Sequence, residues 1–99
     1  MPTPESESCA SRLKVLSDQT RLVVMRFLLE GPHHVGDLQR RLGIEQSLLS
    51  HHLRVLRDSG LVVAERDGKA VLYEVAREVV VPREGEAIDL GCCVLSFDR

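Results

Sequence analysis

Three cysteines have the side chains best suited to chemistry in this 99-residue chain. Cys92 and Cys93 are adjacent near the C-terminus, and Cys9 lies near the N-terminus. Consecutive Cα atoms stand about 3.8 Å apart, below the usual disulfide range of about 4.4 to 6.8 Å, so a bond between Cys92 and Cys93 would be strained. The pair is better suited to sharing a thiophilic ion. Cys9 is the one further thiol that could complete the trigonal set suited to trivalent arsenic or antimony.

The backbone decides whether the two adjacent thiols can act together. In a regular strand their side chains point to opposite faces, which prevents joint ligation. Gly91 directly precedes them and offers a place for a kink. Cys9 has a second interpretation, because it lies on the apolar stripe of a predicted helix and free cysteine packs as a small hydrophobe. The odd number of cysteines, in a chain without an export signal, predicts reduced thiols and no structural disulfide.

A second set of functional side chains lies on one face of a helix predicted between Gly43 and Gly60. On a 3.6-residue period the inward face holds Leu49, Leu53 and Leu56, joined by Leu48. The opposite face holds Ser47, Ser50, His51, Arg54 and Asp58. Hydroxyl, imidazole and guanidinium groups can bond base edges and phosphates, so one face suits a core and the other suits DNA. His52 lies nearer the buried side and is interpreted as structural.

Three further helices are predicted to position this one, over residues 6–16, 19–30 and 35–42. Ser17 and Asp18 offer an N-cap to the second helix, and Gly31 and Pro32 end it. That helix, RLVVMRFLLE, is apolar almost all round and is expected to be the most buried element. Gly43 then supplies a permissive turn, and Gly60 an αL cap after the fourth helix.

After Gly60 the apolar pattern changes from helical to strand spacing. The segment LVVAERDGKAVLYEVA contains two runs rich in β-branched residues around Asp67-Gly68, the pair that favours a type I′ hairpin. A helix-turn-helix followed by a hairpin is a winged helix, an α+β fold with about four helices and a β-hairpin wing, whose recognition helix enters the major groove. Arg66 and Lys69 flank the tip and are candidates for phosphate contacts. Ordinary solvated turn charges are the alternative.

The chain divides into a DNA-binding domain over residues 1–76 and a tail over residues 77–99 that is predicted to serve sensing and dimer packing. Pro82, Gly85 and Gly91 interrupt the tail, and residues 79–81 favour extended backbone, so the tail is predicted to be non-helical. The apolar side chains that suit it for packing are Ile88, Leu90, Val94, Leu95 and Phe97.

Composition limits the functions that this chain can have. A chain of this length predicts one domain that gains stability by pairing with a second copy. Residues 1–76 hold ten basic and ten acidic side chains, so moderate, salt-sensitive DNA affinity is expected despite a net charge of −2. No stretch approaches the roughly 18 apolar residues of a membrane span, and MPTPESES lacks the pattern of a secretory signal. A cytoplasmic protein without membrane association is expected.

Three segments together resemble the ArsR/SmtB family of winged helix-turn-helix repressors. They are LSDQTRLVVMRFLLEG, VGDLQRRLGIEQSLLSHHLRVLRDSGLV and RDGKAVLYEV, within residues 13–76. The resemblance implies a homodimer that binds double-stranded operator DNA of inverted-repeat type. It also implies release from that operator when a metal ion, metalloid or redox signal reaches cysteines elsewhere in the chain.

The resemblance also implies roles for individual residues. Those that match the family's base- and phosphate-facing positions are Gln46, Ser47, Ser50 and His51. Gln46 can bond adenine in bidentate fashion. Arg54 and Arg57 are expected to contact the DNA backbone.

Two familiar sensing patterns of the family have no counterpart here. His34 and Gly36 stand where many members carry the two cysteines of an E-L-C-V-C-D-L motif. His33 and His34 could ligate a borderline metal, although exposed loop histidines are the commoner reading. The paired Asp/His and His/Glu ligands of a terminal helix are also missing, because the chain contains no histidine after Val75.

The three cysteines are therefore the candidate sensing site. As(III) or Sb(III) is the first predicted inducer, and Cd, Pb or Zn is the second. Thiol oxidation or persulfide formation is the third predicted signal. The segment between Ala76 and Cys92 can extend up to about 50 Å, so Cys9 of the same subunit or of a partner subunit could complete the site.

Two other classes of protein are alternatives to a DNA-binding regulator. An enzyme is not expected, because the chain is short, lacks C-x-x-C, and has no Ser/His/Asp arrangement outside the predicted recognition helix. A winged-helix protein-interaction module that never touches DNA is the stronger alternative, since the body is neutral and the tail acidic. Such a module would show no steep dependence of DNA binding on salt.

Overall fold

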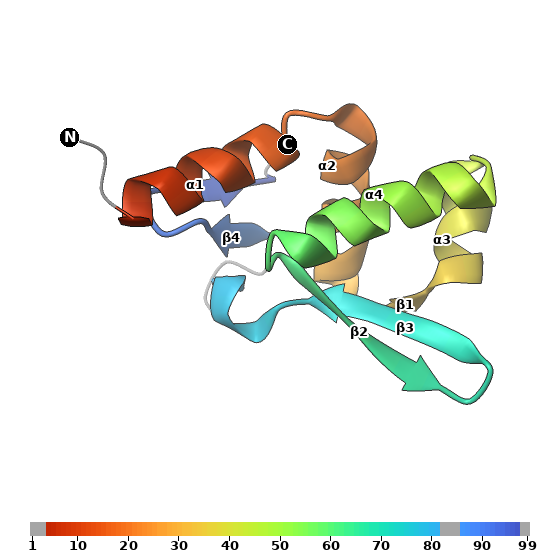
Figure 1. Cartoon of the computed structure of the whole chain (residues 1–99). Helices are drawn as coiled ribbons and strands as arrows, with labels where there is room; N and C mark the ends of the chain where they lie inside the picture. Colours follow the sequence, from red (N-terminus) through yellow and green to blue (C-terminus); the bar gives the residue numbers. More distant parts are fainter. Residues whose placement is uncertain (1–3, 82–85, 98–99) are drawn as a thin grey trace.

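The computed structural model describes residues 4–81 and 86–97 of the chain. Four helices come first, with a very short strand between the second and third: α1 (Pro4–Val15), α2 (Gln19–Glu30), β1 (His33–His34), α3 (Val35–Leu42) and α4 (Gln46–Asp58). A hairpin follows, formed by β2 (Val62–Asp67) and β3 (Ala70–Val75), and it projects beside α3 and α4 (Figure 1). The predicted α+β winged helix is therefore confirmed.

The predicted ends of α2, α3 and α4 are confirmed by specific caps, whereas α1 begins at Pro4 and ends at Val15 instead of spanning residues 6–16. Asp18 caps α2, since its Oδ1 accepts from the Arg21 backbone N–H at 3.0 Å, and this bond lowers the pKa of Asp18. Gly43 follows α3 in the left-handed region, with a φ of 66°. Gly60 has a φ of 79°, and the N–H of the next residue reaches back to Leu56 O at 3.1 Å. These bonds satisfy carbonyls at the end of α4 that would otherwise lack partners.

The wing belongs to a three-stranded antiparallel sheet in the order β1-β3-β2. Its register pairs Asp67 with Ala70, so the two-residue loop is Gly68-Lys69. Gly68 has a φ of 64°, whereas no non-glycine residue in the described part of the chain has a positive φ. The turn is thus of type II′, with a positive φ at its first central residue only. The predicted type I′ turn at Asp67-Gly68 was wrong by one residue, because strand pairing sets the register.

The core lies between α2, α3, α4 and the sheet. Leu38, Leu49, Leu53 and Leu56 are buried from the helix side, and Leu61, Val62, Tyr73 and Val75 from the hairpin side. Leu48, predicted to face inward, is instead 47% exposed, since it lies about 100° around the helix from Leu49.

The expectation that α2 is the most buried element was only partly correct. Its fully buried side chains are Val24, Met25 and Leu28, and α4 buries four side chains. The other large apolar side chains of α2 are half-buried, namely Leu22, Val23, Phe27 and Leu29. An apolar surface therefore remains on α2 in the single chain.

The described part of the tail is non-helical apart from one 3-10 turn, η1 (Arg77–Val79). Strands β4 (Ala87–Asp89) and β5 (Val94–Ser96) form a second antiparallel hairpin, which lies along α1 (Figure 1). Ile88 and Leu90 are buried in the main core, whereas Val94 is 55% exposed. Val79 belongs to the 3-10 turn, contrary to the extended backbone expected there. The predicted breaks at Pro82 and Gly85 lie outside the described residues.

Candidate nucleic-acid interface and thiol site

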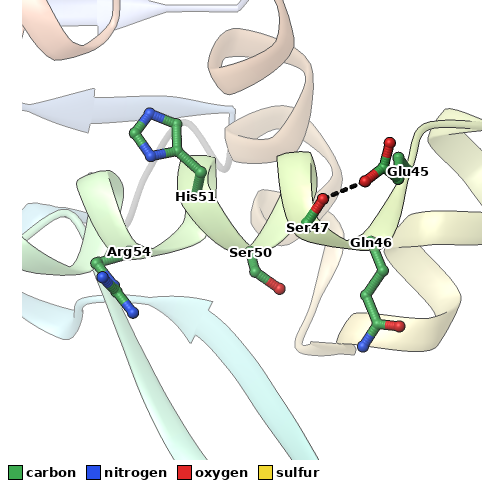
Figure 2. Close-up of a pocket in the computed structure, with 6 residues that line it drawn as sticks. All are labelled: Glu45, Gln46, Ser47, Ser50, His51 and Arg54. Atoms are coloured by element: carbon green, nitrogen blue, oxygen red, sulfur yellow. Dashed lines mark hydrogen bonds between the residues drawn. The ribbon is translucent and has the colours of Figure 1, made fainter.

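The outward face of α4 presents polar side chains in a regular row. Gln46, Ser50 and Arg54 recur every four residues and project from the same side of the helix (Figure 2). Ser47 and His51 join them in lining a shallow concavity, which has a volume of about 640 Å³. All five side chains are exposed. The buried leucines on the opposite face fix the rotation of α4 and so determine which side chains point outward.

The wing and α4 border a common groove. Gln46 and Ser50 of α4 line it together with Lys69 at the tip of the wing, and its volume is about 370 Å³. Arg66 on β2 and Arg57 in the last turn of α4 are also exposed but do not line this groove. The structure thus brings Lys69 close to the row on α4 and leaves Arg57 and Arg66 outside the groove.

Glu45 was missed by the sequence interpretation. It occupies the N-cap position of α4 by its backbone conformation, and its side chain accepts a hydrogen bond from Ser47 Oγ instead of capping the helix. Glu45 also lines the concave surface of α4 (Figure 2). A carboxylate therefore stands among groups suited to a polyanion. The signal was available, because an acidic residue directly precedes Gln46 in the turn.

His52 is a structural residue, as predicted. It is 7% exposed, and Arg21 Nε donates to its Nδ1 at 3.0 Å across the α2–α4 contact. Burial lowers the pKa of His52, and the charges of Arg21 and His51 lower it further against the opposing effect of Asp18. Because Nδ1 accepts from Arg21, the neutral ring carries its proton on Nε2.

His33 and His34 bond to two different carboxylates. His33 Nδ1 donates to Asp37 Oδ2 at 2.6 Å, which lowers the pKa of Asp37. His34 Nε2 donates to Asp67 Oδ2 at 2.8 Å and so ties the start of α3 to the wing. Within residues 4–81 and 86–97, neither histidine belongs to a group of three or more possible metal ligands.

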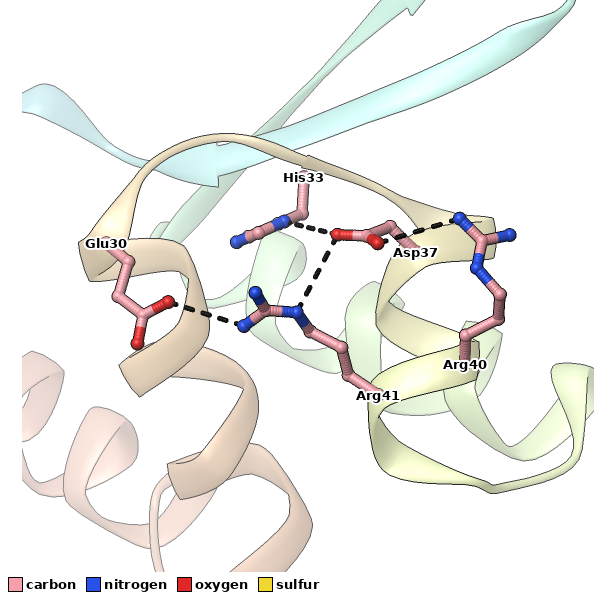
Figure 3. Close-up of polar contacts among 5 residues, drawn as sticks. All are labelled: Glu30, His33, Asp37, Arg40 and Arg41. Carbon is pink, nitrogen blue, oxygen red and sulfur yellow. Dashed lines mark hydrogen bonds and ion pairs between the residues drawn. The ribbon is translucent and has the colours of Figure 1, made fainter.

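Arg41 faces α2 and not the outward side of α4. Its Nη1 stands 3.3 Å from Glu30 Oε1 and its Nε 4.0 Å from Asp37 Oδ2 (Figure 3). Its guanidinium also lies 5.1 Å from the centre of the Phe27 ring. Arg40 pairs with Asp37 at 3.6 Å. The contacts of Arg41 with Glu30 and Phe27 join α3 to α2, whereas the two pairs with Asp37 lie within α3.

The three cysteines meet between α1 and the turn that joins β4 to β5. Their Sγ atoms all lie within 4.8 Å of one another. Cys9 and Cys92 are joined in a disulfide with their Cα atoms 5.9 Å apart, and Cys93 is free and exposed. The prediction of three reduced thiols was therefore wrong. The cause is tertiary, since packing of the hairpin on α1 brings together residues that are 83 positions apart.

The predicted kink at Gly91 is confirmed and explains how adjacent cysteines share one site. Gly91 has a φ of 102°, and its N–H donates to Asp89 Oδ1 at 2.8 Å. Leu90 N–H donates to Cys93 O at 2.9 Å, which closes a tight turn. In a turn the two side chains are not forced to opposite faces, as they would be in a regular strand. The single chain thus brings all three sulfurs together.

Two kinds of chemistry are open to this cluster. With metal–sulfur bonds of about 2.3 Å, three sulfurs around one centre stand about 4.0 Å apart or closer, so a modest contraction of the reduced cluster would let all three bind a single ion. Only a thiolate is a ligand, however, so the disulfide must first be reduced. Oxidation and ion binding therefore compete for the same two sulfurs.

The fold, the exposed row on α4 and the wing define a winged helix-turn-helix regulator. Residues 18–63 match the family described as bacterial regulatory protein, arsR family. The chain is 43% identical over 79 residues to the HTH-type transcriptional regulator NmtR of Mycobacterium tuberculosis, a match that covers 80% of this chain and 66% of NmtR. It is 33% identical over 94 residues to a probable mercury resistance operon repressor of Streptomyces lividans, covering 95% of this chain and 72% of that protein. The chain belongs to the arsR family.

Solved structures agree with this assignment. HlyU from Vibrio cholerae superimposes with a TM-score of 0.73 at 33% identity, covering 76% of this chain and 82% of HlyU. A homodimeric winged helix-turn-helix DNA-binding domain of Mb0332 from Mycobacterium bovis gives a TM-score of 0.69 at 29% identity, covering 73% and 67%. The chain spans between 58% and 66% of the length of NmtR and of two further relatives that it matches at 42% identity. None of the helices in the described residues is long and apolar enough to span a membrane.

Proposed function

We propose that this chain is a cytoplasmic, homodimeric repressor that leaves its operator when a thiophilic ion binds Cys9, Cys92 and Cys93. As(III) or Sb(III) is the first candidate for that ion. One observation carries the proposal: the fold gathers the only three thiols of the chain within 4.8 Å, although Cys9 and Cys92 are 83 residues apart. Three thiolates arranged around one point suit a pyramidal trivalent ion.

The DNA half of the proposal rests on α4 and the wing. Gln46, Ser47, Ser50 and His51 are assigned to base edges and nearby phosphates. Arg54, Arg57, Arg66 and Lys69 are assigned to the phosphate backbone. All eight side chains are exposed, and a dimer would present them twice. Leu13 of α1, which is 43% exposed, supplies apolar surface for a second copy.

Coupling between the two sites requires that the ion prefer a DNA-free conformation. Cys9 is fully buried on α1, and the thiol turn belongs to a hairpin whose Ile88 and Leu90 enter the core. Rearranging the sulfurs around an ion therefore moves the hairpin against α1. In a dimer closed near α1, that movement would change the spacing between the two copies of α4.

Titration of arsenite into a protein–DNA complex tests the proposal. The reduced protein is bound to a duplex selected from a random library, and binding is followed by mobility shift at several salt concentrations. We expect a steep salt dependence and release by arsenite, but no release by arsenate, which thiolates do not bind directly. X-ray absorption should count three sulfurs on arsenic in the wild type and fewer in Cys9→Ser, Cys92→Ser and Cys93→Ser. Unchanged DNA affinity with all three thiols reduced would contradict the proposed inducer.

The same titration separates the alternatives. Cd, Pb or Zn is favoured if one of them releases the DNA at lower concentration than arsenite. Absence of a steep salt slope, in any redox state, would favour a protein-interaction module in place of a DNA-binding protein.

The disulfide supports oxidation as a second candidate signal. Hydrogen peroxide would take two electrons and two protons from the Cys9 and Cys92 thiols, so that the S–S bond forms and two water molecules leave. Cys93 distinguishes the two signals, because it belongs to the thiolate set but not to the disulfide. Under the ion proposal, Cys93→Ser loses the response to arsenite. Under the redox proposal, the same variant still responds to peroxide.

A further inference from the structure

A groove between α2 and β5 lies apart from both sites described above. Its apolar walls are Leu22 and Val23 of α2, with Leu95 and Phe97 of the C-terminal hairpin segment. These four side chains are half-buried, and the groove has a volume of about 300 Å³. That volume is at the lower end of the range for small-molecule sites.

Arg26 contributes the charged side chain of this groove. Its Nη2 is buried, and among the described residues no acceptor lies within hydrogen-bond distance of that atom. Glu30, one helical turn further along α2, pairs with Arg41 instead. A buried guanidinium nitrogen without an acceptor is costly, so a shift of the Arg26 side chain that presents this nitrogen to an anion in the groove would be favourable.

We propose that the groove binds a small amphipathic carboxylate. The carboxylate accepts hydrogen bonds from Arg26, since the guanidinium fork matches carboxylate geometry. The apolar body lies between Leu22 and Val23 on one side and Leu95 and Phe97 on the other. A purely polar anion would leave these walls unused, and a neutral apolar molecule would leave Arg26 Nη2 unsatisfied.

The size of the groove limits the ligand. Its volume corresponds to roughly ten water molecules, which suits a monocarboxylic acid of about six to eight carbon atoms. A ligand in this position contacts α2 and the hairpin at once. It would therefore hold the segment that follows the thiol turn against the helix that packs on α4.

Sodium hexanoate is a suitable probe, titrated into the isotope-labelled oxidised protein without DNA and followed by backbone amide NMR shifts. We expect saturable shifts confined to residues 22–26 and 95–97. Hexan-1-ol has the same apolar body without the charge, and acetate has the charge without the body. Each should bind at least tenfold more weakly than hexanoate.

Variants assign the binding to Arg26. Arg26→Gln should weaken hexanoate binding at least tenfold, and Arg26→Lys should restore part of it because the charge is kept. Arg77→Gln is the matched control: Arg77 lines a different apolar-walled groove together with Glu74 and Glu78, so its loss should change nothing. The unfolding midpoint of each variant shows whether it is folded.

Three results would overturn the proposal. They are equal binding of hexanoate and hexan-1-ol, full binding by Arg26→Gln, and shifts in residues 22–26 that follow protein concentration but not hexanoate. The last result would mean that a second copy of the chain covers the groove. DNA binding and arsenite release are measured separately, so failure here leaves the proposed function untouched.

Discussion

The α4 face and the thiol site are built in opposite ways. The outward row on α4 is positioned by one continuous helix whose inward leucines are fully buried. The thiol site joins α1 to a hairpin 83 residues later and is held by a covalent bond as well as by packing. A site on one helix depends on local periodicity and on the core beneath it. A site assembled from both ends of the chain depends on the whole fold and on the redox state.

The largest effect is expected from removing packing beneath α4. Leu53 is 1% exposed, so Leu53→Ala should lower the free energy of unfolding by about 2–5 kcal/mol, through lost burial and the cavity left behind. Val94→Ala in the hairpin is the control, since Val94 is 55% exposed and should change stability by less than about 0.5 kcal/mol. Urea unfolding followed by circular dichroism measures both. If both variants lower the free energy of unfolding by the same amount, the buried leucines of α4 do not stabilise the fold more than an exposed side chain does.

Reducing the disulfide should have the next largest effect. The bond links residues 83 apart, and opening a loop of that length should lower the free energy of unfolding by about 2–4 kcal/mol. Urea unfolding with and without a reductant measures the loss. Cys93→Ser should behave like the wild type in both conditions, because Cys93 is outside the bond. If Cys92→Ser shows no loss relative to the oxidised wild type, the hairpin is held by packing alone.

The contrast between the two regions explains which features were predictable. Leu49, Leu53 and Leu56 repeat at helical spacing, so the orientation of α4 and the outward position of Ser50 followed from local pattern. Leu48 was wrongly placed on the inward face of α4. A residue next to Leu49 in sequence lies about 100° around the helix from it and therefore points to a different side. The wing was predicted as an element, but its turn was displaced by one residue because strand pairing, and not the Asp-Gly pair alone, sets the register.

The thiol site was predictable in its chemistry but not in its bonding. Adjacent cysteines after Gly91 indicated a kinked site, and Cys9 was the only candidate for a third sulfur. No local pattern can show that the hairpin packs on α1 with Cys92, and not Cys93, facing Cys9. The carboxylate of Glu45 was overlooked for a different reason, because the helical periodicity of α4 covers only residues inside the helix and leaves out the acidic residue directly before Gln46.

Gln46→Ala tests the α4 face at its most directional contact. We expect DNA affinity to fall by about 1–3 kcal/mol if Gln46 bonds a base in bidentate fashion, with most of the loss at one position of the selected site. Stability should be unchanged, because Gln46 is exposed. Arsenite binding by the reduced protein should also be unchanged. That result would show that the α4 face and the thiol site bind their ligands independently. Equal loss of affinity for all sequences would reassign Gln46 to phosphate contact.

Glu45→Gln should have a smaller effect and the opposite sign. Removing a carboxylate near the phosphates should raise affinity for non-specific DNA by about threefold to tenfold, in the range of one charge near a polyanion. Glu65→Gln, an exposed acidic change on β2, is the control for net charge. Fluorescence anisotropy with a non-specific duplex measures the change. A fall in affinity would show instead that Glu45 accepts a hydrogen bond from a base, as a carboxylate can from cytosine N4.

The smallest effect concerns the contact of α2 with α4 and depends on pH. Burial lowers the pKa of His52 below its ordinary value of 6.5, so the unfolded chain binds a proton at this ring more readily than the folded chain does. The stabilisation is therefore complete above pH 6.5 and is lost as the pH falls through the folded pKa. Protonation of Nδ1 would also remove the acceptor of the Arg21 hydrogen bond.

Urea unfolding of the oxidised protein at pH 8 and pH 5.5 measures this effect while keeping the disulfide closed. The carboxyl of Asp18 has a lowered pKa and stays ionised across that window, so the loss of stability is assigned to histidine. His52→Gln keeps a hydrogen-bond acceptor without titrating near neutral pH and should flatten the dependence. His51→Gln, an exposed change one residue earlier, should leave the dependence as in the wild type. If both variants behave alike, the α2–α4 contact does not carry the pH response and the orientation of α4 depends on its leucines alone.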